Sequence, residues 1–278
     1  MSYRIVLDSS GELPKEYANN PHFVHVALGL EVGDYQIMDD ENFNRTEFLE
    51  KVAAYAKSPK SSCPSPEMYK EAYHCDEENI FVITLSSKLS GSYNSAMLGK
   101  SLYHEQYGDK NIQVIDSLSA SCGETQIGLK AMELSEEGLP FEEIVTKLEE
   151  YRDEMKTYFV LDNLETLRKN GRLTGVKALV ASTLSIKPVM GSIEGSIIQK
   201  SQAIGIKKSL TKMVDIIVSE CKNAESKRLI IAQCNCEQRA LAVKEMLLAK
   251  QKFGEILITE TAGLSSMYAN DGGIIVTV

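Results

Sequence analysis

Residues 80–99 constrain the fold more than any other stretch, because they predict a strand, a turn and a helix in immediate succession. The apolar run that starts at Ile80 is typical of a strand buried on both faces. It ends in serines around Gly91, after which apolar residues recur at helical spacing. The first amides of a helix lack internal partners, so hydroxyls beside them suit a carboxylate or a phosphate. The stretch therefore predicts an anion site or, with equal weight, a helix capped by Ser90 or Ser92.

Two more predicted strands, over 3–7 and 112–115, end in similar chemistry. Strands that alternate with helices indicate a mostly parallel sheet, whose ligands usually lie beyond the carboxyl ends of its strands. We expect the polar strand ends to line one edge of this sheet, where each aspartate faces a ligand or caps a helix. These residues are Asp8, Ser9, Ser10, Ser86, Ser87, Asp116 and Ser117.

Three prolines within 58–66 predict a loop, since proline removes a donor and biases its predecessor towards extended geometry. By spacing alone, Ser61 and Ser62 in this loop are turn residues. Ser65 before Pro66 predicts the start of a helix. Another apolar segment covers 23–30, and other helical patterns of this half cover 44–57, 122–136 and 141–155.

The pattern changes near residue 157, where we place a domain boundary. The first domain, 1–157, is predicted to be α/β and to carry the anion site. The second, 158–278, combines strands with helices, and its last strand is free to join either sheet. Its predicted elements are strands over 158–161, 229–234, 255–259 and 274–278, a hairpin from Ile186 to Lys200 around Gly191 and Gly195, a short helix closed by Gly171, and helices over 176–184, 208–221 and 237–251.

Composition excludes several classes of function. A net charge of -9 over 278 residues argues against a general nucleic-acid or anionic-membrane surface. No apolar stretch approaches the roughly 18 residues that a membrane helix needs. The six cysteines are scattered and lie apart from the histidines, which argues against a disulfide scaffold or a metal site. We expect a cytoplasmic protein that is not an integral membrane protein and needs no metal or other cofactor.

Two catalytic motifs fail when they are tested residue by residue. A phosphate-binding loop that ended at Gly99 and Lys100 would need glycine at position 94, where the chain has Asn94. A serine hydrolase would need Gly-x-Ser-x-Gly and a histidine base, and neither is evident around Ser90. The sequence offers a place to hold an anion without an obvious group to transform it.

Several motifs together resemble the DegV family of bacterial lipid-binding proteins, which includes the fatty-acid-binding subunits of fatty acid kinase. Their order and spacing along most of the chain carry the resemblance. They are Ile5-Val-Leu-Asp-Ser9, Ser61-Ser-Cys-Pro-Ser-Pro66, Leu85-Ser-Ser-Lys-Leu-Ser-Gly-Ser-Tyr-Asn-Ser-Ala96, Val114-Ile-Asp-Ser117, Asn170-Gly-Arg172 and Ile186-Lys-Pro188.

The resemblance implies a two-domain α/β DegV-like fold, with a mostly parallel N-terminal sheet and a C-terminal α/β sandwich, that buries one fatty acid between its domains. The positions that hold the carboxylate in the family fall on Ser61, Ser62, Ser90 and Gly91. Arg172 matches an arginine near the ligand head or the kinase-docking surface. In a supporting or kinase-facing role we add Asp8, Ser9, Asp116 and Ser117.

The chain departs from the family pattern at three places. Cys63 stands where glutamine is common, and Asn170 stands where the first glycine of Gly-Gly-Arg is common. Near the end, many members carry a His-Thr-Gly-Pro-Gly type segment, which is missing here, so the role of that histidine does not carry over. Candidates to replace it are Ser265, Ser266 and Tyr268.

The expected function is that of an acyl carrier without catalytic activity of its own. It would hold a C14 to C18 fatty acid as ligand and present the carboxylate to the catalytic subunit of a separate fatty acid kinase, which makes an acyl-phosphate. Two alternatives remain at this stage: a hydrolase or transferase with Ser90 or Ser62 as nucleophile, and a binder of another anionic amphiphile without a kinase partner.

Overall fold

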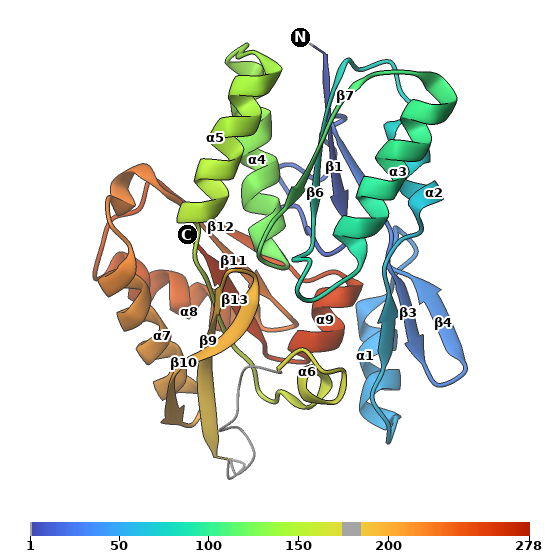
Figure 1. The fold of residues 1–278 in the computed structure, drawn as a ribbon. Coiled ribbons are helices and arrows are strands. Elements are labelled where there is room, and N and C mark those ends of the chain that lie inside the picture. Colours follow the sequence, from blue (N-terminus) through green and yellow to red (C-terminus); the bar gives the residue numbers. More distant parts are fainter. Residues whose placement is uncertain (1, 174–184) are drawn as a thin grey trace.

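The computed structural model describes residues 2–173 and 185–278, which form three β-sheets with helices packed around them. Figure 1 shows the four-stranded sheet and its helices on one side of the molecule and the six-stranded sheet on the other. This arrangement confirms the predicted α/β class. The helix predicted over 176–184 lies outside the described residues.

The four-stranded sheet is parallel throughout, as the alternation of strands and helices predicts. Its two central strands are almost entirely buried, because helices cover both faces. In spatial order the strands are β2 (Phe23–Val26), β1 (Tyr3–Asp8), β6 (Asn79–Thr84) and β7 (Asn111–Asp116).

Alternate residues of these strands enter two different cores. Val6 and Val82 face α2 (Pro66–Tyr73) and α3 (Ser92–Tyr107), which cover one side of the sheet. Leu7 faces the opposite core, which is closed by the helices predicted over 122–136 and 141–155. These are α4 (Cys122–Glu136) and α5 (Phe141–Glu154).

A small antiparallel sheet corrects the prediction that 58–66 is only a loop. Lys60–Ser62 forms strand β5, in which Ser62 pairs with Gly29 and Ser61 pairs with Leu30. The prolines flank this strand and leave its pairing groups free, which is why it forms. The apolar segment predicted over 23–30 is likewise split between two sheets. The other strands of the small sheet are β3 (Gly29–Val32) and β4 (Tyr35–Met38), and α1 (Arg45–Ala54) follows them.

The six-stranded sheet contains only strands from Thr157 onward, although a division into domains at 157 stays a prediction. The C-terminal strand joins this sheet between β8 and β11 and runs antiparallel to both. In spatial order the strands are β10 (Ser196–Ile204), β9 (Ile186–Ile193), β8 (Thr157–Val160), β13 (Ile274–Thr277), β11 (Arg228–Gln233) and β12 (Glu255–Glu260).

The helices of this half include two that pack on one face of the sheet and two short ones near its edge (Figure 1). The sequence patterns over 208–221 and 237–251 predict the first two, and the pattern that Gly171 closes predicts α6. The helix at 263 was not predicted. The four are α6 (Glu165–Lys169), α7 (Ile206–Glu220), α8 (Glu237–Leu248) and α9 (Gly263–Ala269), and a 3-10 turn covers Ala224–Ser226.

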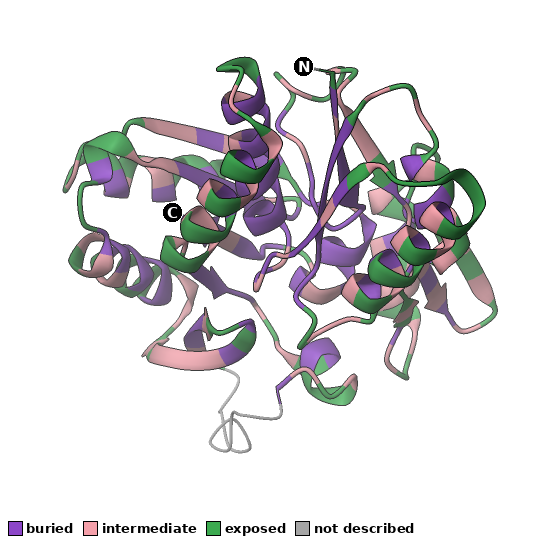
Figure 2. Ribbon diagram, turned by 45° about the horizontal axis from the view of Figure 1, so that its top comes forward, coloured by how far each residue is buried: buried purple, intermediate pink, exposed green. Residues whose placement is uncertain are grey.

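Helix α4 lies between the two large sheets and is buried along most of its length (Figure 2). Its apolar core includes Leu7 from the first sheet and Ile230 from the second. The Gln126 amide donates to Arg228 O over 2.9 Å and to Thr277 O over 3.2 Å. The two sheets therefore share one helix rather than meeting across a gap.

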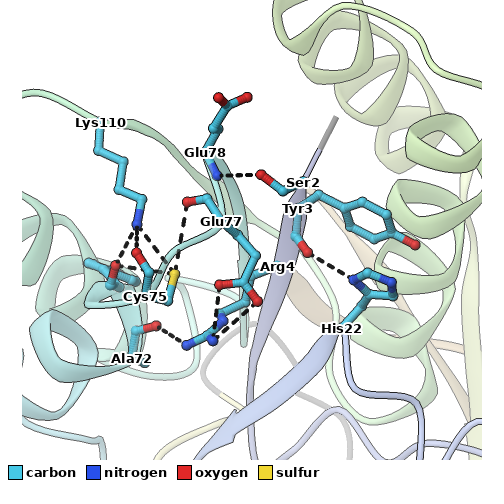
Figure 3. A network of polar contacts seen from close by, with 10 residues as sticks. Ser2, Tyr3, Arg4, His22, Ala72, Cys75, Glu77, Glu78 and Lys110 are labelled. Carbon is cyan, nitrogen blue, oxygen red and sulfur yellow. Dashed lines mark hydrogen bonds and ion pairs between the residues drawn. The ribbon is translucent and has the colours of Figure 1, made fainter.

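Polar contacts hold the amino end of the four-stranded sheet (Figure 3). Arg4 on β1 forms an ion pair with Glu77 over 3.1 Å and donates to Ala72 O. Lys110, just before β7, donates to Cys75 O over 2.6 Å. These contacts fix the loop between α2 and β6, and the carboxyl ends of the strands lie at the opposite edge.

Candidate functional site

The strand-end aspartates hold the turns in place. Asp8 Oδ2 accepts a hydrogen bond from Leu85 N over 2.9 Å. Asp116 Oδ1 accepts from Ser87 N and from Leu118 N, each over 3.1 Å. Each carboxylate thus bonds the amide of a neighbouring turn, and neither residue lines the large cavity described below.

The serines beside them have similar local bonds. Ser9 Oγ donates to Asp39 Oδ2 over 3.0 Å and accepts from Leu28 N. Ser117 Oγ donates to Ser119 O and accepts from Ser119 N. These bonds shape the loops around the site from behind, because neither serine lines the cavity.

A cavity of about 370 Å³ lies between the carboxyl ends of the parallel strands and the second half of the chain. Its volume is within the range of small-molecule sites. Both halves of the chain contribute to its wall, which is predominantly apolar. The apolar side chains among its described lining residues include Leu28, Leu85, Leu89, Leu118, Phe159, Leu161, Leu167, Ile197, Leu264 and Ile275.

The cavity has a solvent-exposed end and a buried end. Ser62, Cys63 and Gly91 at one end are exposed, and Ser61 and Ser90 beside them are half-buried. We call these five residues the mouth. All four residues predicted to hold a carboxylate thus lie together, although they come from segments about 30 positions apart in sequence.

The hydroxyls at the buried end are bonded within the protein, and at the mouth the Ser90 hydroxyl is bonded to Ser92. No described residue forms a hydrogen bond with the Ser61 or Ser62 hydroxyl in this structure. The buried hydroxyls have partners within the protein, which reduces the cost of their burial beside an apolar ligand. Their bonds run from Ser10 to Glu124, from Ser121 to Glu12 and between Ser119 and Thr157.

Close packing sets the position of the mouth. Ser62 Oγ lies against Gly29, where a Cβ would collide with it. On the other side, a Cβ at Gly91 would lie 3.1 Å from Cys63 Sγ. Ser62 therefore packs closely on β3, and Cys63, directly after β5, packs closely on the start of α3.

The serines beside Gly91 form local hydrogen bonds at the start of α3, and their predicted role in holding an anion stays a prediction. Gly91 is the N-cap residue of α3, and the helix has no side-chain cap bond. Ser90 Oγ accepts from Ser92 N over 3.2 Å and lies 3.0 Å from Ser92 Oγ. Ser90 thus bonds the first helical amide while its hydroxyl still lines the cavity.

Arg172 is the one charged side chain among the described residues that line the cavity. Its guanidinium donates to two neutral carbonyl oxygens, over 3.2 Å to Leu89 O and also to Asn170 O. Within 2–173 and 185–278 it forms no ion pair. An unpaired cation therefore lies directly beside the turn that carries Ser90.

A group of buried carboxylates lies behind the cavity, of which Asp8 was named from the sequence and Glu12, Asp39 and Glu124 were missed. Burial raises the pKa of Glu12 to about 7 and that of Asp39 to about 6, and it raises the pKa of Asp8 as well. The pKa of Glu124 is held well above its usual range by burial and by the neighbouring Asp8 charge. Only Glu124 had a visible signal, since it is an acidic residue within an otherwise buried helix.

Two of these carboxylates position α9. Asp39 accepts from Gly263 N over 2.6 Å and from Leu264 N over 2.8 Å. Glu12 accepts from Ala262 N over 3.1 Å. Helix α9 supplies cavity wall, so residues of the first half determine where part of the second half lies.

The candidates to replace the missing histidine divide by position. Ser265 and Tyr268 line the cavity, whereas Ser266 does not, and its hydroxyl lies 2.8 Å from Thr261 Oγ1. The described lining contains no histidine, so Ser90 has no imidazole base there. Over the described ranges, no group of His, Cys, Asp and Glu is suited to a metal ion, and no helix is long and apolar enough to cross a membrane.

Comparison with known proteins places these features in a family. Residues 2–277 match the family described as "Uncharacterised protein, DegV family". A DegV domain-containing protein of Streptococcus pneumoniae R6 is 36% identical over 280 residues, covering 99% of this chain and 98% of its own.

Several solved structures are similar to this chain in both fold and sequence. A DegV family protein of Ruminococcus gnavus with vaccenic acid has a TM-score of 0.98 and 52% identity over 100% of both chains. A Eubacterium eligens protein loaded with heptadecanoic acid has a TM-score of 0.90 and 27% identity over 99% of both. The Streptococcus pneumoniae fatty acid kinase (Fak) B3 protein loaded with linoleic acid has a TM-score of 0.88 and 35% identity, covering 100% of this chain and 99% of its own. This chain belongs to the DegV family.

Proposed function

We propose that this chain is a cytoplasmic acyl carrier that binds one long-chain fatty acid between its halves, 1–157 and 158–278, and presents the carboxylate to a separate fatty acid kinase. The head group lies at the mouth, where Ser61, Ser62, Ser90 and the Gly91 amide hold it. The hydrocarbon tail fills the apolar interior. The chain itself catalyses no step.

The single observation that carries this proposal is Arg172, which forms no ion pair with any described residue and lies beside the Ser61 and Ser62 hydroxyls, on a cavity whose wall is mostly apolar. A buried apolar tail and an anionic head fit such a wall. A carboxylate left without donors at the mouth would oppose binding by its desolvation penalty, so several donors are needed. Arg172 supplies a positive charge for the carboxylate, and no ion pair with a described acidic residue has to break for it to do so.

Burial of the tail supplies most of the affinity. Each methylene that leaves water contributes roughly 0.8 kcal/mol, so a C16 tail contributes on the order of 10 kcal/mol before ordering costs. The mouth adds less energy and more selectivity, because it distinguishes a carboxylate from a neutral head of equal length.

Relatives support both parts of the proposal. Three proteins of similar structure have been solved with vaccenic, heptadecanoic and linoleic acid, respectively. The kinase partner rests on one of them, the fatty acid kinase B3 protein, at 35% identity. Presentation to a kinase requires an accessible carboxylate, which agrees with an exposed mouth.

The direct test is mass spectrometry of the purified, denatured protein prepared without detergent. We expect about one equivalent of a C14 to C18 free acid. If none is released, and the refolded protein does not bind added acid, the proposal is wrong.

A second test concerns the head group. The double variant Ser62→Ala/Ser90→Ala loses two hydrogen bonds to a charged group, so affinity for palmitate should fall on the order of 100-fold. Affinity for hexadecanol should change much less. Ser101→Ala, at an exposed serine of α3 outside the cavity lining, is the control. Unchanged palmitate affinity in the double variant would overturn the head-group assignment.

The kinase step is tested separately. The loaded protein, a purified candidate kinase and ATP should yield acyl-phosphate, trapped as a hydroxamate, and omission of the kinase should abolish the product. Product formed without any kinase would contradict the non-catalytic assignment.

A further inference from the structure

Asn170 lies at the C-cap of α6, two residues before Arg172, and its side chain reaches into the first half of the chain. Its amide Nδ2 donates to Pro59 O over 2.9 Å. Pro59 immediately precedes β5, the strand that carries Ser61 and Ser62. Asn170 therefore holds the backbone directly before the strand that carries Ser61 and Ser62.

The same residue supports the other half through Arg172. The Asn170 carbonyl oxygen accepts from Arg172 Nη1, while Arg172 Nε donates to Leu89 O. Leu89 immediately precedes Ser90. Asn170 and Arg172 of the second half thus bond the backbone directly before each of the two serine elements.

A third contact connects Asn170 to the cavity wall. The Asn170 amide also lies 3.5 Å from the Tyr268 hydroxyl, and Tyr268 belongs to α9 and lines the cavity. The side chain is half-buried, so these contacts are partly shielded from water. A chain with glycine at position 170 would lack the contacts that the Asn170 side chain makes with Pro59 and Tyr268, because glycine has no side chain.

We infer that Asn170 is a positioning residue for the carboxylate site. It sets the spacing between the Ser61–Ser62 strand and the Ser90–Gly91 turn. The inference rests on the proposed function, since it concerns the same mouth. An amide is suited to this role because Pro59 O needs a donor, while the backbone carbonyl of the same residue orients the guanidinium. Asn170 itself need not touch the ligand.

Two substitutions at Asn170 probe this role. Asn170→Gly removes the side-chain bonds. Asn170→Asp keeps the shape but places an acceptor against Pro59 O and a negative charge beside the head-group site. Lys169→Gln is the matched control, because Lys169 is the exposed neighbour and does not line the cavity.

The experiment measures release rates of palmitate and of hexadecanol from each full-length variant, with unfolding of the ligand-free protein as a check on the fold. We expect Asn170→Gly to release palmitate up to about tenfold faster, as loss of one hydrogen bond allows. Asn170→Asp should be faster still. Hexadecanol release should change less in both variants, and Lys169→Gln should match the wild type.

Equal changes for acid and alcohol would overturn the inference, because a residue that only stabilises the fold moves both alike. Wild-type palmitate release in Asn170→Gly would also overturn it while leaving the proposed function intact. Failure of the wild type to bind palmitate at all would instead overturn the proposed function and this inference with it. Where Asn170→Asp does not fold, Asn170→Gly decides.

Discussion

The Ser86 hydroxyl donates to the Gly195 carbonyl oxygen over 3.0 Å and so joins the turn after β6 to the tip of the β9–β10 hairpin. Gly195 lines the cavity and has a φ of +77°, and a Cβ there would collide with Ser86 Oγ. The contact therefore holds the hairpin tip, which forms part of the cavity wall, against the turn after β6.

Gly195→Ala should therefore lower the free energy of unfolding by about 2 to 3 kcal/mol, because the collision with Ser86 adds to the backbone strain at positive φ. The control is Gly138→Ala, which has a φ of +78° but open space around the new Cβ. Urea unfolding of both variants, and of Gly195→Ala combined with Ser86→Ala, separates strain from collision. If Gly195→Ala lowers the free energy of unfolding by no more than Gly138→Ala does, the predicted collision with Ser86 is refuted.

Glu12 should make stability depend on pH. Its pKa is near 7 in the folded chain and near 4.5 in the unfolded one, so the folded state holds a proton that the unfolded state releases. The free energy of unfolding therefore falls as pH rises from about 4.5 to 7, by on the order of 3 kcal/mol.

Glu12→Gln should remove this part of the pH dependence. Urea unfolding at pH 5 and pH 8 measures it, with Glu16→Gln at an exposed position as the control. Asp39 and Glu124 leave a residual slope in both proteins, because their pKa values are raised as well. A Glu12→Gln slope equal to that of the wild type would contradict the prediction.

Cys63 should report on occupancy of the mouth. It is the exposed member of the six cysteines, and it lines the cavity beside Gly91. A maleimide should label Cys63 first, and added palmitate should slow this labelling several-fold by covering the thiol. Labelling kinetics by mass spectrometry provide the measurement, with Cys63→Ser to identify the site. Equal rates with and without palmitate would place the ligand elsewhere.

Gly99 should reverse the usual preference for alanine in a helix. A Cβ there would lie 2.7 Å from Pro66 O and 2.9 Å from Tyr69 Cβ, so α2 and α3 approach too closely for a methyl group. Gly99→Ala should destabilise the protein by about 1 to 3 kcal/mol, although alanine normally gains about 1 kcal/mol over glycine inside a helix. Thermal unfolding beside Ser101→Ala tests this, and stabilisation by Gly99→Ala would contradict it.

Local patterns predicted most of the first half of the fold. The strand–turn–helix around Gly91 and the helix that begins after Ser65 both form, and Ser65 Oγ accepts from Met68 N as a cap should. These elements depend on residues close in sequence, so their signals are complete within a short window.

Elements that depend on distant partners escaped prediction. Strand β5 exists because Gly29–Glu31 pairs with it, and strand β4 and helix α9 likewise had no predicted counterpart. In the predicted hairpin, Gly195 does lie in the turn, but Gly191 lies within β9, where a Cβ would come within 3.0 Å of Thr157 O. The glycine signal was present, and its cause was close approach rather than a turn.

The mouth was predictable and the support behind it was not. Ser61, Ser62, Ser90 and Gly91 follow from the family resemblance, and the structure brings them together. Glu12 and Asp39 have no such pattern, because an exposed and a buried carboxylate look alike in sequence. Their role depends on amides of α9 more than 220 positions away.

The shared helix α4 also imposes an order on synthesis. One side of α4 covers the first sheet as soon as residues 1–136 have left the ribosome, but its other side awaits Ile230 and Ala232. Until β11 emerges, the nascent chain carries an uncovered apolar surface, the kind that chaperones recognise and that aggregates. A truncation just before β11 therefore exposes the centre of the molecule and not merely its end.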